Sequence, residues 1–206
     1  MALSGGETPK ALYTLLASAA YRERFPWQRV HWFWGDERCV PHDDPASNYK
    51  MVRQAMLSVV PVSASNIHAV PTDLPPLEAA RAYERELQTY YGAIRLDPLR
   101  PLFDAVLLGL GADGHTASLF PGTEALNERK HWTAVGVGPG AQPRITLTYP
   151  VLESTHAAAF LIAGSSKVPM LTRLMAGDSG LPAARLRPTG ELLLFADHVA
   201  LGRAGT

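Results

Sequence analysis

Residues 109–122, GLGADGHTASLFPG, follow directly on the nearly continuous apolar run of residues 103–108. Together the two segments decide the fold. A short apolar run of this kind predicts a strand covered on both faces in a mainly parallel sheet. Ligands of such sheets bind beyond the carboxyl ends of the strands. The glycines of the segment allow tight turns and a close approach to a ligand. We therefore expect Asp113 and His115 to lie at a ligand-binding crevice; the alternative is a plain turn that joins a strand to a helix.

Strand-like and helix-like segments alternate along the rest of the chain. Strands are predicted at residues 2–3, 30–34, 66–70, 103–108, 144–149, 157–163 and 191–195. Helices are predicted at residues 9–20 with Thr8 as the N-cap, 47–58 with Ser47 as the N-cap, 76–91 and 165–175. This alternation predicts an α/β fold with a doubly wound, mainly parallel, Rossmann-like sheet and helices on both faces. We expect one domain over residues 1–206.

The amino terminus is short for such a fold. The first predicted strand opens only three residues before its loop, whereas strands usually have about five residues. We therefore expect the amino terminus to be truncated. Either the sequence begins at an internal Met or the sheet is narrower than usual.

Composition limits the classes of function. The 206 residues are 47% apolar and 18% charged, which is typical of a globular protein. Nineteen basic residues balance nineteen acidic ones without a basic block, so no nucleic-acid partner and no anionic membrane surface is expected. The first residues show neither the basic region nor the apolar region of a signal peptide, so none is expected. No apolar run approaches the roughly 18 residues that span a bilayer. We expect a cytoplasmic protein with a small-molecule partner.

Metal and nucleotide cofactors are not expected. The single Cys39 and the scattered histidines have no zinc-ligand spacing. The first turn carries no GxGxxG pattern of a dinucleotide site.

The first loop offers a candidate anion site. Ser4, Gly5, Gly6 and Thr8 lie between a strand and a helix amino terminus, where free N–H groups and the helix dipole favour a phosphate. A simple helix cap is the alternative for this segment.

Charged residues follow two other strands. Asp36, Glu37 and Arg38 end one strand, and the Arg38 guanidinium suits bidentate binding of a phosphate or carboxylate. A surface ion-pair cluster is the alternative, and it is an equal one for Glu37. Lys167 lies early in a helix, where the dipole disfavours a cation unless an anion is bound. Arg144 opens a strand and either reaches the same anion or is solvated.

His115 is the residue best suited to activating water. A neutral imidazole has a pKa of about 6.5, which matches proton abstraction near neutral pH. Asp113 is two residues away and either orients the ring or binds a hydroxyl. Nucleophilic attack by Thr116 or Ser118 is a poorer alternative because no GxSxG motif is present.

Five segments together resemble the 6-phosphogluconolactonase family. They are SGGETP at 4–9, WGDERCVPHDDPASNY at 34–49, GLGADGHTASLFPG at 109–122, RITLTYPVL at 144–152 and AGSSK at 163–167. The resemblance implies a carboxylic ester hydrolase that converts 6-phospho-D-glucono-1,5-lactone to 6-phosphogluconate in the oxidative pentose phosphate pathway, without metal or organic cofactor. It also implies that His115 is the general base. The residues implied to hold the phosphate and the sugar hydroxyls are Ser4, Gly5, Gly6, Arg38, Lys167 and Arg144.

Two other functions stay open as alternatives. The same superfamily includes glucosamine-6-phosphate deaminase, for which Asp36 could supply the carboxylate base, but residues 116–120 lack the Glu that the deaminases place there. A sugar-phosphate sensor without catalysis is the other alternative, against which the intact His115 argues.

Overall fold

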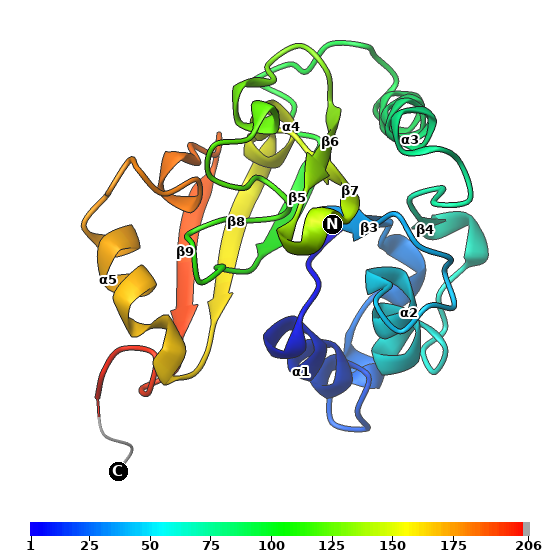
Figure 1. Cartoon of the computed structure of the whole chain (residues 1–206). Coiled ribbons are helices and arrows are strands. Elements are labelled where there is room, and N and C mark those ends of the chain that lie inside the picture. The colour runs from blue at the N-terminus through cyan, green and yellow to red at the C-terminus, as the bar shows by residue number, and fades with distance from the viewer. Residues whose placement is uncertain (204–206) are drawn as a thin grey trace.

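The computed structural model describes residues 1–203 and confirms the α/β prediction. Within these residues, six parallel strands form one sheet in the order β4-β2-β1-β5-β8-β9 (Figure 1). They are β1 (Ala2–Leu3), β2 (Trp32–Trp34), β4 (Ile67–His68), β5 (Phe103–Leu108), β8 (Thr155–Ile162) and β9 (Glu191–Ala196). Because the strands are parallel, their carboxyl ends meet at one edge of the sheet.

A second, three-stranded antiparallel sheet was not predicted. It consists of β3 (Asp36–Arg38), β7 (Pro143–Leu147) and β6 (Thr133–Val137). Neither β3 nor β6 is among the strands predicted from the sequence, whereas the strand predicted at 144–149 is found as β7 and belongs to this sheet. β3 has only three residues, all charged, and β6 contains a glycine, so these two strands lack the apolar pattern by which buried strands are recognised.

The helices differ from prediction mainly at their ends. They are α1 (Glu7–Leu16), α2 (Asn48–Val52), α3 (Pro76–Tyr91), α4 (Tyr149–Glu153) and α5 (Val168–Met175). The bounds of α3 are those predicted, and Gly92 ends it in the left-handed conformation. Ser47 caps α2 as predicted, but the α-helix ends at Val52 and continues as a π-helical turn. Residue 149, predicted in a strand, begins α4.

Helix α1 corrects the predicted N-cap. Gly6, not Thr8, holds the N-cap position, at a φ of 100° that glycine adopts without strain. The helix ends at Leu16 instead of residue 20. Similarly, the helix predicted from residue 165 opens with a 3₁₀ turn at Ser165–Lys167 before α5 begins.

Two buried tyrosines complete the hydrogen bonding where strands of the main sheet stop pairing. The pairing of β2 with β4 ends at Phe33. One residue later, the Tyr83 hydroxyl accepts a hydrogen bond from the Trp34 amide at 2.8 Å and donates to its carbonyl at 3.0 Å. Tyr13 bonds the amide and carbonyl of Ser4, just after β1, in the same way. These hydroxyls satisfy backbone groups that no strand reaches.

We expect Tyr83→Phe to destabilise the protein without loss of apolar packing. The variant leaves the buried amide and carbonyl of Trp34 without their partner, at a cost of about 1–3 kcal/mol. Tyr90→Phe is the control, because its side chain is 43% exposed. Urea unfolding measures both, and an equal midpoint for the two variants would contradict the proposed role of the Tyr83 hydroxyl.

A cleft at the strand ends with a His–Asp pair

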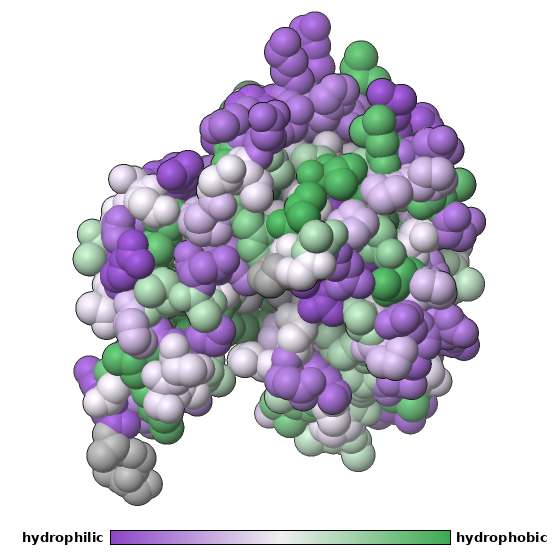
Figure 2. Space-filling view, in the orientation of Figure 1, coloured by the Kyte–Doolittle hydropathy of each residue, from purple (hydrophilic) through white to green (hydrophobic). Residues whose placement is uncertain are grey.

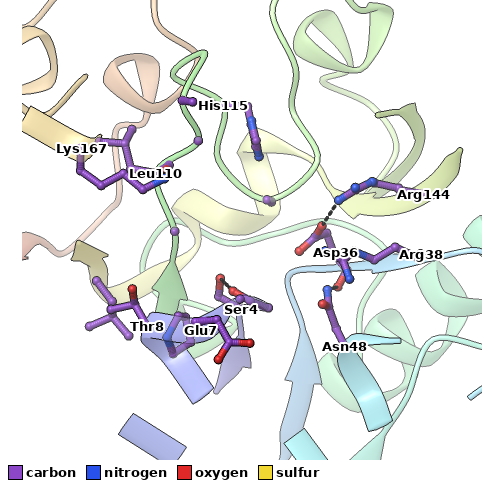
Figure 3. A pocket seen from close by; sticks show the side chains of 18 residues that line it. Ser4, Glu7, Thr8, Asp36, Arg38, Asn48, Leu110, His115, Arg144 and Lys167 are labelled. Carbon is purple, nitrogen blue, oxygen red and sulfur yellow. Dashed lines mark hydrogen bonds and ion pairs between the residues drawn. The ribbon is translucent and has the colours of Figure 1, made fainter. Parts of the chain in front are cut away.

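A cleft of about 420 Å³ lies beyond the carboxyl ends of β1 and β5. The face of the molecule in Figure 2 is hollowed near its centre, and Figure 3 shows the cleft from close by. Nine of the predicted site residues line it: Ser4, Gly5, Gly6, Thr8, Asp36, Arg38, His115, Arg144 and Lys167. Segments more than a hundred residues apart in the sequence therefore meet here, as the parallel topology predicts.

The first side of the cleft is the amino terminus of α1. No side chain among residues 1–203 caps this end, and the first helical hydrogen bond runs from the Lys10 amide to the Gly6 carbonyl. The amides that precede Lys10 therefore have no helical acceptor. Lys167 lies across from them, in the turn before α5, and its Nζ donates to the Leu110 carbonyl at 2.7 Å. An ammonium group and a helix amino terminus both favour an anion between them.

His115 projects into the cleft, with Lys167 on one side and Arg38 and Arg144 on the other (Figure 3). Its Nδ1 lies 2.5 Å from a carboxylate oxygen of Asp113, which also accepts from the His115 amide at 3.1 Å. Partial burial favours a higher pKa for Asp113, but these hydrogen bonds from His115 outweigh it and hold the pKa below its usual value. Asp113 itself does not line the cleft. It contacts the imidazole through Nδ1 alone, so the ring lies between Asp113 and the cleft.

Arg38 and Arg144 form the other cationic end. They are direct cross-strand partners in the β3–β7 pair. Burial, followed by the neighbouring Arg38 guanidinium, lowers the pKa of Arg144. The Nε atoms of both arginines are buried without a hydrogen-bond partner in the described part of the chain. Like charges directly opposite each other are unfavourable, so this end of the cleft is suited to a ligand with negative or polar oxygen atoms.

A buried carboxylate lies beside the arginines. Asp36 Oδ2 is 3.9 Å from Arg144 and accepts a hydrogen bond from the Ser118 hydroxyl at 2.6 Å. Ala117, between the His115 segment and Ser118, has a φ of 48° in the left-handed region. A non-glycine residue there is strained, and such strain gathers at functional sites. The Asp36–Ser118 bond ties this strained turn to β3.

The sequence did not reveal how Glu37 and Asn48 contribute. Glu37 is 1% exposed, which excludes the surface ion-pair alternative. Burial raises the pKa of Glu37, and hydrogen bonds from the Tyr49, Asn48 and Arg38 amides offset part of this effect. Asn48 lines the cleft and donates from Nδ2 to the Asp36 carbonyl at 2.9 Å. The motif DER followed by SNY contains both residues, but only the structure shows that they touch.

The described residues contain no group of three or more His, Cys, Asp and Glu side chains that could hold a metal ion. No helix among residues 1–203 has the length and apolar character needed to cross a membrane.

Comparison with known proteins places the chain in a sequence family. Residues 1–195 match the model of the family described as glucosamine-6-phosphate isomerases/6-phosphogluconolactonase. The chain is 45% identical over 204 residues to a 6-phosphogluconolactonase from Nostoc sp., covering 97% of this chain and 82% of that protein. It is 44% identical to a 6-phosphogluconolactonase from Synechocystis sp., with the same coverage.

Solved structures agree on the fold. The crystal structure of 6-phosphogluconolactonase from Thermotoga maritima aligns with a TM-score of 0.79 at 32% identity, covering 95% of this chain and 83% of that chain. A monomeric glucosamine-6-phosphate deaminase aligns with a TM-score of 0.80 at 22% identity, covering 98% of this chain and 86% of that one. At this lower identity the second likeness shows the shared fold alone.

We expect Gly5→Ala to disturb the floor of the cleft. A Cβ at Gly5 would lie 2.0 Å from Oδ1 of Asn48, whose amide is held by the Asp36 carbonyl. Overpacking of this kind costs about 1–3 kcal/mol. Gly109→Ala is the matched control in the same cleft, because its Cβ would meet only Ser4 Oγ at 3.6 Å. Thermal unfolding should show a lower Tm for Gly5→Ala alone, and equal Tm values would contradict the close packing of Asn48 on Gly5.

Proposed function

Because the chain belongs to the glucosamine-6-phosphate isomerase/6-phosphogluconolactonase family, we propose that it hydrolyses 6-phospho-D-glucono-1,5-lactone to 6-phosphogluconate. Identity of 45% and 44% to proteins named as lactonases supports this branch of the family over the isomerases. The observation that carries the mechanism is the Asp113–His115 pair, which presents an imidazole to a cleft with cations on both sides.

In this proposal His115 is the general base. In this arrangement Nδ1–H donates a hydrogen bond to the Asp113 carboxylate, so the ring lone pair is on Nε2. Nε2 takes a proton from water as the water oxygen bonds to C1 of the lactone. The tetrahedral intermediate then collapses: the bond from C1 to the ring oxygen breaks, and the imidazolium returns its proton to that oxygen. Asp113 keeps the ring in one tautomer and stabilises the imidazolium.

The cations bind the substrate on both sides of the reacting carbon. We assign the phosphate to Lys167 and the amino terminus of α1, because the ammonium group and the helix dipole both favour an anion there. The loop residues at this end of the cleft are Ser4, Gly5, Gly6 and Thr8. We assign sugar hydroxyls and the charge that develops on the carbonyl oxygen to the end formed by Asp36, Arg38 and Arg144. No step of this mechanism uses a metal or an organic cofactor.

His115→Ala should lower kcat by about 100-fold to 10,000-fold, which is the usual contribution of a positioned acid–base group, with a smaller change in KM. His131→Ala is the matched control, because His131 also pairs with a carboxylate, that of Glu84 at 3.4 Å, but lies outside the cleft. Initial rates of proton release from freshly prepared lactone, corrected for spontaneous hydrolysis, measure both. Near wild-type turnover of His115→Ala would exclude His115 as the base.

Lys167→Ala should weaken the binding of the phosphorylated lactone by about 1.5–3 kcal/mol, the range for hydrogen bonds to charged groups. The loss should appear as a higher KM and as weaker discrimination against unphosphorylated gluconolactone. Lys130→Ala, which changes an exposed lysine away from the cleft, serves as the control. If Lys167→Ala discriminates as strongly as the wild type, Lys167 does not hold the phosphate.

A further inference from the structure

Glu37 is a buried carboxylate that the proposed mechanism does not use. It lies in β3 between the two cleft residues Asp36 and Arg38, and it is 1% exposed. No lysine or arginine pairs with it among residues 1–203. Burying a charge without a cation is costly unless hydrogen bonds satisfy it.

Hydrogen bonds from two segments satisfy this carboxylate. Oε1 accepts from the amides of Arg38 at 2.8 Å and Asn48 at 2.7 Å. Oε2 accepts from the Tyr49 amide at 2.7 Å and the Ser47 hydroxyl at 3.1 Å. Each oxygen therefore meets at least one backbone N–H group. One carboxylate joins β3 to the amino terminus of α2.

Capping of the helix does not by itself account for this arrangement. Ser47 already caps α2, because its side chain accepts from the Lys50 amide at 3.1 Å. The bonds from Glu37 instead fix the backbone of two residues that line the cleft, Arg38 and Asn48, relative to one another. The Asn48 side chain is held in the cleft by the Asp36 carbonyl, and it occupies the space that a side chain at Gly5 would need.

We propose that Glu37 is a positioning residue for substrate binding, which sets the distance between the Arg38 and Asn48 sides of the cleft through the backbone of both. The inference rests on the proposed function, which assigns Arg38 to the sugar end of the substrate, and it adds Asn48 to that end. Glu37 does not touch the substrate. Its effect should therefore be on KM for the lactone and on Kd for the product, with kcat changed much less.

Glu37→Gln tests the proposal with little change in volume. In either orientation of the amide, its NH₂ group replaces an oxygen that accepts from a backbone N–H, so a flip of the side chain cannot restore the bonds. KM for 6-phosphogluconolactone should rise about 10-fold to 100-fold, the equivalent of about one hydrogen bond to a charged group. The control is Glu153→Gln, which removes another carboxylate whose pKa is raised by burial and which accepts from the Arg187 amide at 2.8 Å, away from the cleft.

A merely structural role gives a different result. Glu153→Gln should lower Tm and leave KM unchanged, whereas Glu37→Gln should raise KM measured on the folded protein. If Glu37→Gln does not fold, Ser47→Ala decides, because it removes one of the four donors and keeps the three backbone bonds. It also removes the Ser47 cap on the Lys50 amide, a loss that should appear in Tm. It should raise KM in the same direction by a smaller factor. An unchanged KM in either variant, with a lowered Tm, would overturn the proposal.

Binding of 6-phosphogluconate, measured by calorimetry, separates this inference from the proposed function. If the wild type binds 6-phosphogluconate but does not hydrolyse the lactone, the proposed function fails. The role of Glu37 is then read from the Kd, which should rise in Glu37→Gln and not in Glu153→Gln. If the lactone is hydrolysed and the Kd is the same in all three proteins, the proposed function stands and the positioning role is overturned.

Discussion

The site depends on the hydrogen bonds that the buried backbone amides and carbonyls make where β1 and β2 end. At Gly35 the chain leaves the main sheet, since its amide still donates to Leu3 at 2.8 Å while its carbonyl accepts from Leu147 of the second sheet at 2.9 Å. Tyr13 and Tyr83 satisfy the neighbouring amides and carbonyls that no strand reaches. Backbone groups left unpaired there would be costly. The two sheets can therefore separate here without leaving buried backbone groups unpaired. The cleft lies along the line where they separate.

The charges in the cleft follow from the same geometry. The switch into an antiparallel sheet places Arg38 opposite Arg144, whereas the parallel sheet brings the α1 amino terminus and Lys167 to the other side. The imidazole of His115 lies between these two positive ends, oriented by Asp113 from outside the cleft. A site of this form suits a substrate that is anionic at one end and carries a reactive carbonyl in the middle.

The sequence predicted the parts of this arrangement that periodicity and strand order determine. The apolar run of β5, the helix α3 and the gathering of loop residues at one sheet edge were foreseen, because each follows from a local pattern or from parallel topology. The antiparallel sheet was not, because β3 is short and charged, and its pairing with β7 joins residues 36–38 to 144–146 without a local signal. The burial of Glu37 was missed for a similar reason: a carboxylate in a charged DER motif gives no sign that Ser47, Asn48 and Tyr49 donate hydrogen bonds to it from the next helix.

The most direct test of the account compares three substrates with the wild-type protein. Initial rates of proton release are measured with 6-phosphogluconolactone and with unphosphorylated gluconolactone, each corrected for spontaneous hydrolysis, and ammonia release is measured with glucosamine 6-phosphate. We expect rapid hydrolysis of the phosphorylated lactone, a much slower reaction of the unphosphorylated one and no release of ammonia. Ammonia release, or no acceleration of either lactone above its spontaneous rate, would contradict it.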